Sequence, residues 1–261
     1  MEPWLSLSAF KELMYRLRTF TAQRFLTRLR RATHRMPIKL RPVEHARVLV
    51  ISPHYDDETI GCGGTLLLHR NAGSVVRVVF ATNCEDGISS PYIARAVSKV
   101  RLTEASRVAC LMGFESIKPY TFRNAIGHEN QLSKKLAQEV EAFKPTQVFC
   151  PFPIDAHADH QSCALAVARA LKKTRWQGDV YCYEVWSTLW PNAAVDVTDV
   201  IKEKEDLICM YASQMEDRDY ATAIIALNRY RGLQHRLDYA EAFHVCSPQG
   251  LYAMTDLLNT L

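Results

Sequence analysis

The chain has 261 residues, 48% of them hydrophobic and 23% charged, which is the composition of a globular protein rather than a disordered or fibrous one. No stretch approaches the roughly 18 to 20 uninterrupted apolar residues that span a bilayer, so the sequence predicts no transmembrane helix. The net charge of +4 is unevenly distributed, because residues 1–45 hold ten Lys or Arg against three Glu and the remainder carries −3. The basic segment contains no recognisable nucleic-acid-binding motif, so we expect no nucleic-acid partner.

Residues 8–34 are predicted to form a basic amphipathic helix. Pro37 and Pro42 interrupt any helix that follows, so residues 36–44 are interpreted as a linker between an extension (1–45) and a catalytic domain (46–261). Two interpretations of the helix stay open: peripheral contact with an anionic membrane, or packing on the domain or on another copy of the chain. Apolar residues recur in it at spacings of three and four, with arginines between them: Phe10, Leu13, Met14, Leu17, Phe20, Phe25, Leu26 and Leu29.

From residue 46 onwards, β-branched apolar runs alternate with longer helical patterns. Strands are predicted at residues 48–51, 75–81, 117–121, 147–150 and 180–184, and helices at 63–71, 92–112, 131–143, 160–173 and 200–215. This alternation is typical of an α/β fold, here a Rossmann-like, mostly parallel sheet with helices on both faces.

Eight cysteines are scattered along the chain without a CxxC pair, and most have apolar neighbours. We interpret them as reduced core thiols rather than as disulfides or a cysteine-based zinc site. The N-terminus also lacks the continuous apolar core of a signal peptide. Together these features predict a cytoplasmic protein, and a peripheral place on the inner membrane face if the basic helix binds lipid.

Two polar clusters follow predicted strands at their carboxyl ends, where ligands gather in such sheets. Residues 53–58 follow the first strand, and residues 155–160 follow the strand that ends at Cys150. Either cluster alone is more often a helix cap or a solvated loop. Two together in one crevice are costly unless a metal ion compensates their charges, so we predict a metal site.

A divalent ion poised for hydrolysis needs about three protein ligands and an open position for water. His54, Asp57 and His160 would supply a His2Asp set, leaving Asp56 and His157 for proton transfer and oxyanion stabilisation. Spacing alone does not decide which of these residues bind the ion.

The motif Pro53-His54-Tyr55-Asp56-Asp57-Glu58, followed by Gly61-Cys62-Gly63-Gly64, resembles the PHxDDE and glycine signature of the PIG-L/LmbE-like zinc N-deacetylases. These enzymes remove acetyl from N-acetylglucosamine-containing conjugates. His157-Ala158-Asp159-His160 is similar to their HxDH motif, and the resemblance spans about residues 46–245. Tyr55 and the loop at 82–87 depart from the family pattern. Weaker similar features are Arg101, Glu104, Lys204, Tyr211-Ala212-Ser213-Gln214 and Tyr239-Ala240-Glu241-Ala242-Phe243.

The resemblance implies zinc, or another divalent ion such as Fe²⁺, held by His54, Asp57 and His160. It implies Asp56 as the general base, while a protonated His157 would stabilise the oxyanion and Asp159 would keep that imidazole charged and oriented. The expected reaction removes acetyl from an N-acetylated amino sugar in a glycoconjugate, sugar lipid or sugar nucleotide. The alternatives are an amidase or esterase acting on a non-sugar substrate, and a catalytically inactive sugar- or lipid-binding module.

Arg101 and Arg123 are candidate contacts to a substrate phosphate or hydroxyl. The competing interpretation of Arg101 is a surface ion pair with Glu104, three residues along the same helix. Four aromatic residues could stack on a sugar, although alternating aromatic residues near a strand are more often core: Tyr181, Tyr183, Trp186 and Trp190.

Overall fold

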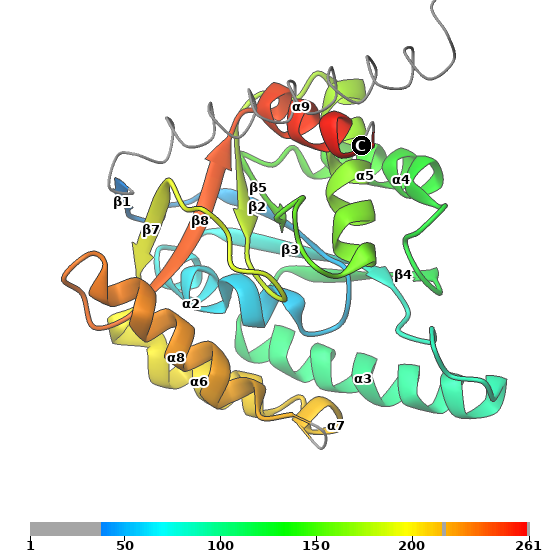
Figure 1. The fold of residues 1–261 in the computed structure, drawn as a ribbon, viewed down its shortest axis with the longest axis horizontal. Helices are drawn as coiled ribbons and strands as arrows, with labels where there is room; N and C mark the ends of the chain where they lie inside the picture. The colour runs from blue at the N-terminus through cyan, green and yellow to red at the C-terminus, as the bar shows by residue number, and fades with distance from the viewer. Residues whose placement is uncertain (1–37, 216–217, 260–261) are drawn as a thin grey trace, which may run out of the picture.

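The computed structural model describes residues 38–215 and 218–259, in which one eight-stranded sheet forms the centre of the molecule (Figure 1). The strands are β1 (Ile38–Leu40), β2 (Arg47–Ser52), β3 (Val75–Thr82), β4 (Ser116–Phe122), β5 (Gln147–Pro151), β6 (Asp179–Tyr183), β7 (Ala193–Asp196) and β8 (Ala240–Cys246). The helices are α2 (Asp57–Asn71), α3 (Pro91–Leu111), α4 (Glu129–Phe143), α5 (Ala158–Thr174), the 3-10 helix η1 (Thr198–Val200), α6 (Ile201–Cys209), α7 (Ala212–Met215), α8 (Tyr220–Leu233) and α9 (Pro248–Asn259). The helix predicted at residues 8–34 lies outside the described residues.

The sheet is covered by helices on both faces, which confirms the predicted α/β class. Helices α2, α3, α6 and α8 lie on one face, and α4, α5 and α9 on the other (Figure 1). Successive side chains of a strand point to opposite faces. Val48 of β2 therefore packs in the core beneath α2, while its neighbour Leu49 packs in the core beneath α4 and α5. Both side chains are fully buried, which explains why this strand reads as a continuous apolar run.

The strand order places two strand ends side by side. It is β1-β7-β8-β6-β5-β2-β3-β4, and the described pairs are parallel except the two formed by β8. The chain runs from β2 outward to β3 and β4 on one side, whereas β5 lies on the other side of β2 and leads outward to β6. The carboxyl ends of β2 and β5 thus flank the point where the winding direction reverses, the usual place for a ligand site in such sheets.

The five predicted strands are all present, but some helix limits differ from expectation. Helix α2 begins at Asp57 rather than near residue 63. Its glycines lie inside the helix, where they allow close packing, and do not form a loop before it. A Cβ atom added to Gly61 would lie 2.3 Å from the Tyr183 ring, and the helix kinks at Cys62, where φ is −144°. The helix predicted at 200–215 is divided into η1, α6 and α7.

Several elements were not predicted. Strand β1 occupies residues 38–40, so the interpretation of residues 36–44 as a linker is wrong for that stretch. Strands β7 and β8 and helices α8 and α9 were also missed. All eight cysteines are free thiols, and five of them are buried as predicted, but Cys110 and Cys209 are exposed. Of the helices that the structure describes, none has the length and apolar character needed to cross a membrane.

Candidate metal centre and active site

The first polar cluster lies in the turn between β2 and α2. Thr82 on the neighbouring strand β3 fixes this turn, because its backbone N–H and its hydroxyl donate to the Pro53 carbonyl at 3.0 and 2.9 Å. Asp56 occupies the N-cap position of α2 but makes no side-chain capping hydrogen bond. The Asp56 side chain therefore does not cap the helix, and its carboxylate is available to a ligand.

Three side chains meet around one carboxylate oxygen. Asp57 Oδ2 lies 3.0 Å from His54 Nδ1 and 3.2 Å from His160 Nε2. His160 is fully buried, and among the described residues neither of its ring nitrogens has a partner with hydrogen-bond geometry. A buried imidazole nitrogen aimed at a carboxylate without a hydrogen bond fits a metal ligand, and two nitrogens with one oxygen are a donor set that zinc accepts.

The opposite charges of these groups shift one another's pKa values. Burial would lower the pKa of His160, but the carboxylates of Asp57 and Asp155 outweigh it and raise this pKa to about 9. Burial would likewise raise the pKa of Asp57, but His160 and His54 hold it well below its usual range. An ion bound here would displace the proton of His160, so its binding should release protons.

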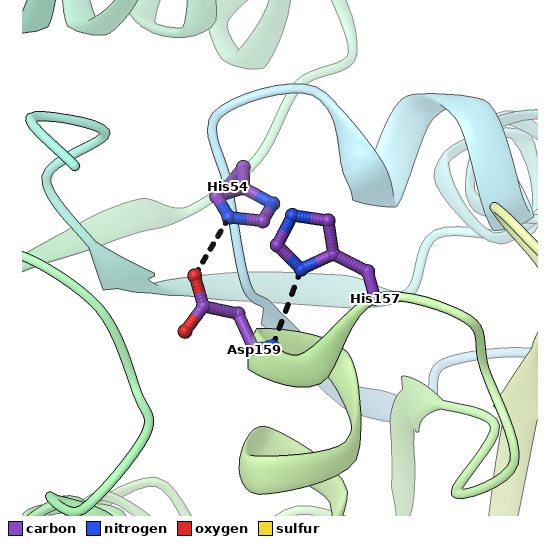
Figure 2. Close-up of side chains that lie close together, drawn as sticks. All are labelled: His54, His157 and Asp159. Atoms are coloured by element: carbon purple, nitrogen blue, oxygen red, sulfur yellow. Dashed lines mark hydrogen bonds and ion pairs between the residues drawn. The ribbon is translucent and has the colours of Figure 1, made fainter. Parts of the chain in front are cut away.

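A second group of possible ligands shares His54 with the first. His54, His157 and Asp159 also bring donor atoms close together (Figure 2). In this group, however, His157 Nδ1 already accepts a hydrogen bond from the Asp159 backbone N–H at 3.2 Å. The group around Asp57 is more deeply buried and retains unsatisfied nitrogens, so it is the better candidate.

The Asp159 carboxylate, which was expected to orient the His157 ring, faces His54 instead, and Asp159 contacts the His157 ring through its backbone N–H. The Asp159 carboxylate lies 3.2 Å from His54 Nε2 (Figure 2). It also accepts a 2.6 Å hydrogen bond from the Ala125 backbone N–H. Burial, followed by repulsion from His54 and His160, lowers the pKa of His157 below its usual value. Since the Nδ1 atom of His157 is an acceptor, the hydrogen bond assigns the proton of a neutral ring to Nε2.

A cavity of about 150 Å³ opens beside these groups, and Asp56, Arg101, His157 and Trp186 are among the side chains that line it. Burial, and then the neighbouring Asp57 carboxylate, raise the pKa of Asp56 to about 7. A carboxylate with this pKa can both take and return a proton near neutral pH.

The structure separates the two candidate arginines. Arg101 lines the cavity, and its buried Nε finds no hydrogen-bond partner among the described residues. Its expected partner Glu104 instead accepts hydrogen bonds from the backbone N–H and the hydroxyl of Ser213, at 3.0 and 2.6 Å. Arg123 does not line this cavity and donates to the Glu85 carbonyl.

The aromatic residues also divide into two sets. Tyr181 and Tyr183 are buried in the core, which agrees with the alternative to sugar stacking, whereas Trp186 is 42% exposed and lines the cavity. Its ring lies 5.9 Å from that of Tyr220 and 5.0 Å from the Arg218 guanidinium. Trp190 is exposed but does not line the cavity.

Asp155 is a site residue to which sequence reasoning gave no role. It precedes the HxDH motif, is almost fully buried, and its Oδ1 lies 3.3 Å from His160 Nδ1. The sequence signal was its place at the start of the second cluster, but two of its contacts are to residues 31 and 32 positions away, which the sequence does not link to it.

Behind the site, a buried ion pair holds the kinked helix α2. Lys204 Nζ lies 2.6 Å from Glu241 Oε1, and both side chains are fully buried. The Glu241 carboxylate also accepts hydrogen bonds from the backbone N–H groups of Gly64 and Thr65, at 2.8 and 2.7 Å. These are the donors that the kink at Cys62 exposes, so the pair fixes the direction of the helix that begins with Asp57.

A larger cavity of about 320 Å³ lies elsewhere, beside α5 and α9. Lys172, Trp176 and Tyr252 are among its lining residues. No histidine, cysteine or carboxylate is among its described lining residues, so the smaller cavity is the better candidate for the active site.

Comparison with known proteins agrees with the motifs. Residues 49–171 match the family model described as PIG-L, GlcNAc-PI de-N-acetylase. The chain is 24% identical over 189 residues to the diacetylchitobiose deacetylase of Thermococcus kodakarensis, which covers 66% of this chain and 71% of that protein.

Solved structures share the fold. The N,N'-diacetylchitobiose deacetylase of Pyrococcus horikoshii aligns with a TM-score of 0.71 and 22% identity over 87% of this chain and 93% of that one. The 4-carboxy-2-hydroxymuconate hydratase of Pseudomonas putida aligns with a TM-score of 0.65 and 21% identity, over 76% and 95%. Because proteins with this fold carry out different reactions, the function must be argued from the site.

Proposed function

Because residues 49–171 form a PIG-L family domain, we propose that this chain is a metal-dependent hydrolase that removes acetyl from an N-acetylated amino sugar. The observation that carries this proposal is the placement of Asp56, with a pKa of about 7, beside the ligand set of His54, Asp57 and His160. A general base next to a three-ligand metal site is the minimum machinery for hydrolysis of an amide.

A divalent ion in this site would polarise the acetamide carbonyl and lower the pKa of the attacking water from about 15.7 toward about 7. Asp56 takes the proton of that water and later returns it to the leaving amine. His157, as a neutral imidazole, donates a hydrogen bond from its Nε2–H to the developing oxyanion and keeps its proton, in contrast to the charged ring that the sequence led us to expect. The products are acetate and a free amino sugar.

The cavity supports a polar, sugar-like substrate. Trp186 offers an aromatic face on which a sugar ring can stack. Arg101, with its unpartnered Nε, is placed to bind a hydroxyl or an anionic group of the substrate. We therefore propose that Arg101→Ala raises KM for substrates that carry a phosphate or carboxylate more than for uncharged ones, with kcat less affected.

Zinc is the proposed ion, because a set of two nitrogens and one oxygen suits it, and Fe²⁺ is the alternative. Metal analysis of the purified protein should find about one divalent ion per chain. A His54→Ala, His160→Ala double variant should lose it, and a stoichiometric ion retained in that variant would refute the ligand assignment.

The substrate class is tested by measuring acetate release from N-acetylated sugars, sugar nucleotides and sugar lipids. The panel should also contain simple amides and esters, since the similarity in fold to a hydratase makes a non-sugar substrate the main competitor. Release confined to the amino sugars supports the proposal. Turnover of the simple amides or esters alone would assign the site to a different hydrolase, and a metal-loaded protein that binds sugars without turnover would be a binding module.

We also propose a cytoplasmic location, where residues 8–34 bring the enzyme to an anionic membrane surface and thus to a lipid-linked substrate. The support is the alternation of arginines with an apolar stripe in the sequence, where each basic residue near the surface adds about 1 kcal/mol. Sedimentation with anionic liposomes should be lost in a chain that starts at Arg41. Equal sedimentation of both chains at low salt would instead favour packing of the segment on protein.

A further inference from the structure

Asp155 lies where two loops of the site meet. Its carboxylate is on the loop between β5 and α5, and Oδ1 accepts a 2.9 Å hydrogen bond from the His157 backbone N–H. Oδ2 accepts hydrogen bonds from the backbone N–H groups of Trp186 and Ser187, at 3.1 and 3.3 Å, on the loop that follows β6. Asp155 is only 2% exposed, so these contacts replace nearly all of its contact with water.

The same carboxylate faces a metal ligand. Asp155 Oδ1 lies 3.3 Å from His160 Nδ1, while Nε2 on the other side of that ring points toward Asp57. A histidine that binds a metal through one nitrogen carries a proton on the other, and that proton is usually donated to a carboxylate or a carbonyl. Among the described residues, the Asp155 carboxylate is the acceptor placed to receive it.

We propose that Asp155 is a positioning residue that holds His160 in the tautomer with Nδ1 protonated and ties the Trp186 loop to the same ligand. This inference rests on the proposed function only in taking His160 as a metal ligand. Its consequence is that metal affinity and the position of the Trp186 ring, which forms the aromatic wall of the cavity, both depend on one carboxylate. If Asp155 only accepted hydrogen bonds from the Trp186 and Ser187 N–H groups, its replacement would disturb the Trp186 wall and leave metal affinity unchanged.

The first test replaces Asp155 by Asn. The amide has one oxygen and one NH2 group in place of two oxygens. Its oxygen can therefore accept hydrogen bonds either on the side of His160 or on the side of the Trp186 and Ser187 N–H groups, but not on both. We expect metal affinity, measured by competition with a chromophoric chelator, to fall about 10- to 100-fold, the usual effect of losing such a partner. We also expect KM to rise.

Two controls separate the effects. Trp186→Ala removes the wall but leaves the His160 contact, so it should raise KM without changing metal affinity. Asp196→Asn alters an exposed carboxylate at the end of β7 that accepts hydrogen bonds from the backbone N–H and the hydroxyl of Thr198, and it should change neither quantity. Metal affinity within twofold of wild type in a folded Asp155→Asn variant would overturn the proposal, and so would an unchanged KM alongside weaker metal binding.

A second measurement uses the wild-type protein and does not depend on any variant folding. Long-range ¹H–¹⁵N spectra of the zinc-loaded protein labelled at histidine should show His160 protonated at Nδ1 and metal-bound at Nε2. The opposite tautomer would overturn the role of Asp155. A wild-type protein that binds no zinc would instead contradict the metal site itself, which distinguishes failure of the proposed function from failure of this inference.

Discussion

Asp159 Oδ2 lies 3.2 Å from His54 Nε2, and this contact places the carboxylate behind a proposed metal ligand rather than behind the His157 ring. We predict that Asp159→Asn lowers metal affinity about 10- to 100-fold, because the carboxylate orients the His54 ring. His157→Ala should leave metal affinity within about twofold of wild type. Chelator competition measures both, and loss of the ion in His157→Ala would favour the alternative group of His54, His157 and Asp159 as the metal site.

Asp56→Asn is predicted to keep the metal ion and to reduce kcat by about two to four orders of magnitude, the contribution usual for a general base. In the wild type, kcat/KM should fall as the pH drops through the pKa of Asp56, because the base is then protonated. Bound metal would shift this limb below pH 7, since its positive charge stabilises the carboxylate. Near-normal turnover by Asp56→Asn would remove this residue from the mechanism.

The buried ion pair behind α2 predicts a large loss of stability. Lys204→Met leaves the Glu241 carboxylate buried without its cation, so the free energy of unfolding should fall by about 3 to 5 kcal/mol. Lys202→Met is the matched control, because Lys202 is exposed and, within the described part of the chain, forms ion pairs with the nearby Glu205 and Asp206 alone. Urea denaturation compares the two, and equal stability of both variants would show that the pair does not anchor the helix.

His69 predicts how stability changes with pH, at a position away from the metal ligands. Its side chain is buried near the end of α2, with Nδ1 3.1 Å from Ser74 Oγ, and burial lowers its pKa from 6.5 to about 4. As the pH falls below 6.5 the unfolded chain takes up this proton first, so stability is lost until the folded pKa is reached.

The loss assigned to His69 is about 3 kcal/mol between pH 7.5 and 4, from the difference between its two pKa values. His69→Gln cannot take up the proton, so its unfolding free energy should decline less over this range, by about that amount. Urea titrations at several pH values measure the difference. Parallel pH profiles for wild type and variant would show that His69 does not contribute.

Local patterns were sufficient to predict the sheet core and that the two polar clusters meet. The strands that became β2 and β5 are buried on both faces and read as continuous apolar runs, and polar residues that follow them come together in the candidate metal centre. Short or partly exposed strands carry weaker patterns. Strand β7 has only four residues, and β1 follows prolines that suggested a linker, so both were missed.

The partners of the site residues could not be predicted because they join distant parts of the chain. Asp155 and Trp186 are 31 positions apart, and Lys204 and Glu241 are 37 apart. No periodicity or motif in a single sequence links such pairs. Asp159 was assigned to His157 because the two are neighbours in one motif, whereas in three dimensions its carboxylate faces His54, 105 positions earlier.

Metal-dependent deacetylation is tested by measuring acetate release from an N-acetylated amino sugar while zinc is titrated into chelator-stripped protein. We predict that release rises in proportion to added zinc and saturates near one ion per chain, with one free amine formed per acetate. The stripped protein and zinc-loaded Asp56→Asn should both remain close to background. Acetate release that is independent of zinc, or none from any amino sugar of the panel by folded, zinc-loaded protein, would contradict the account.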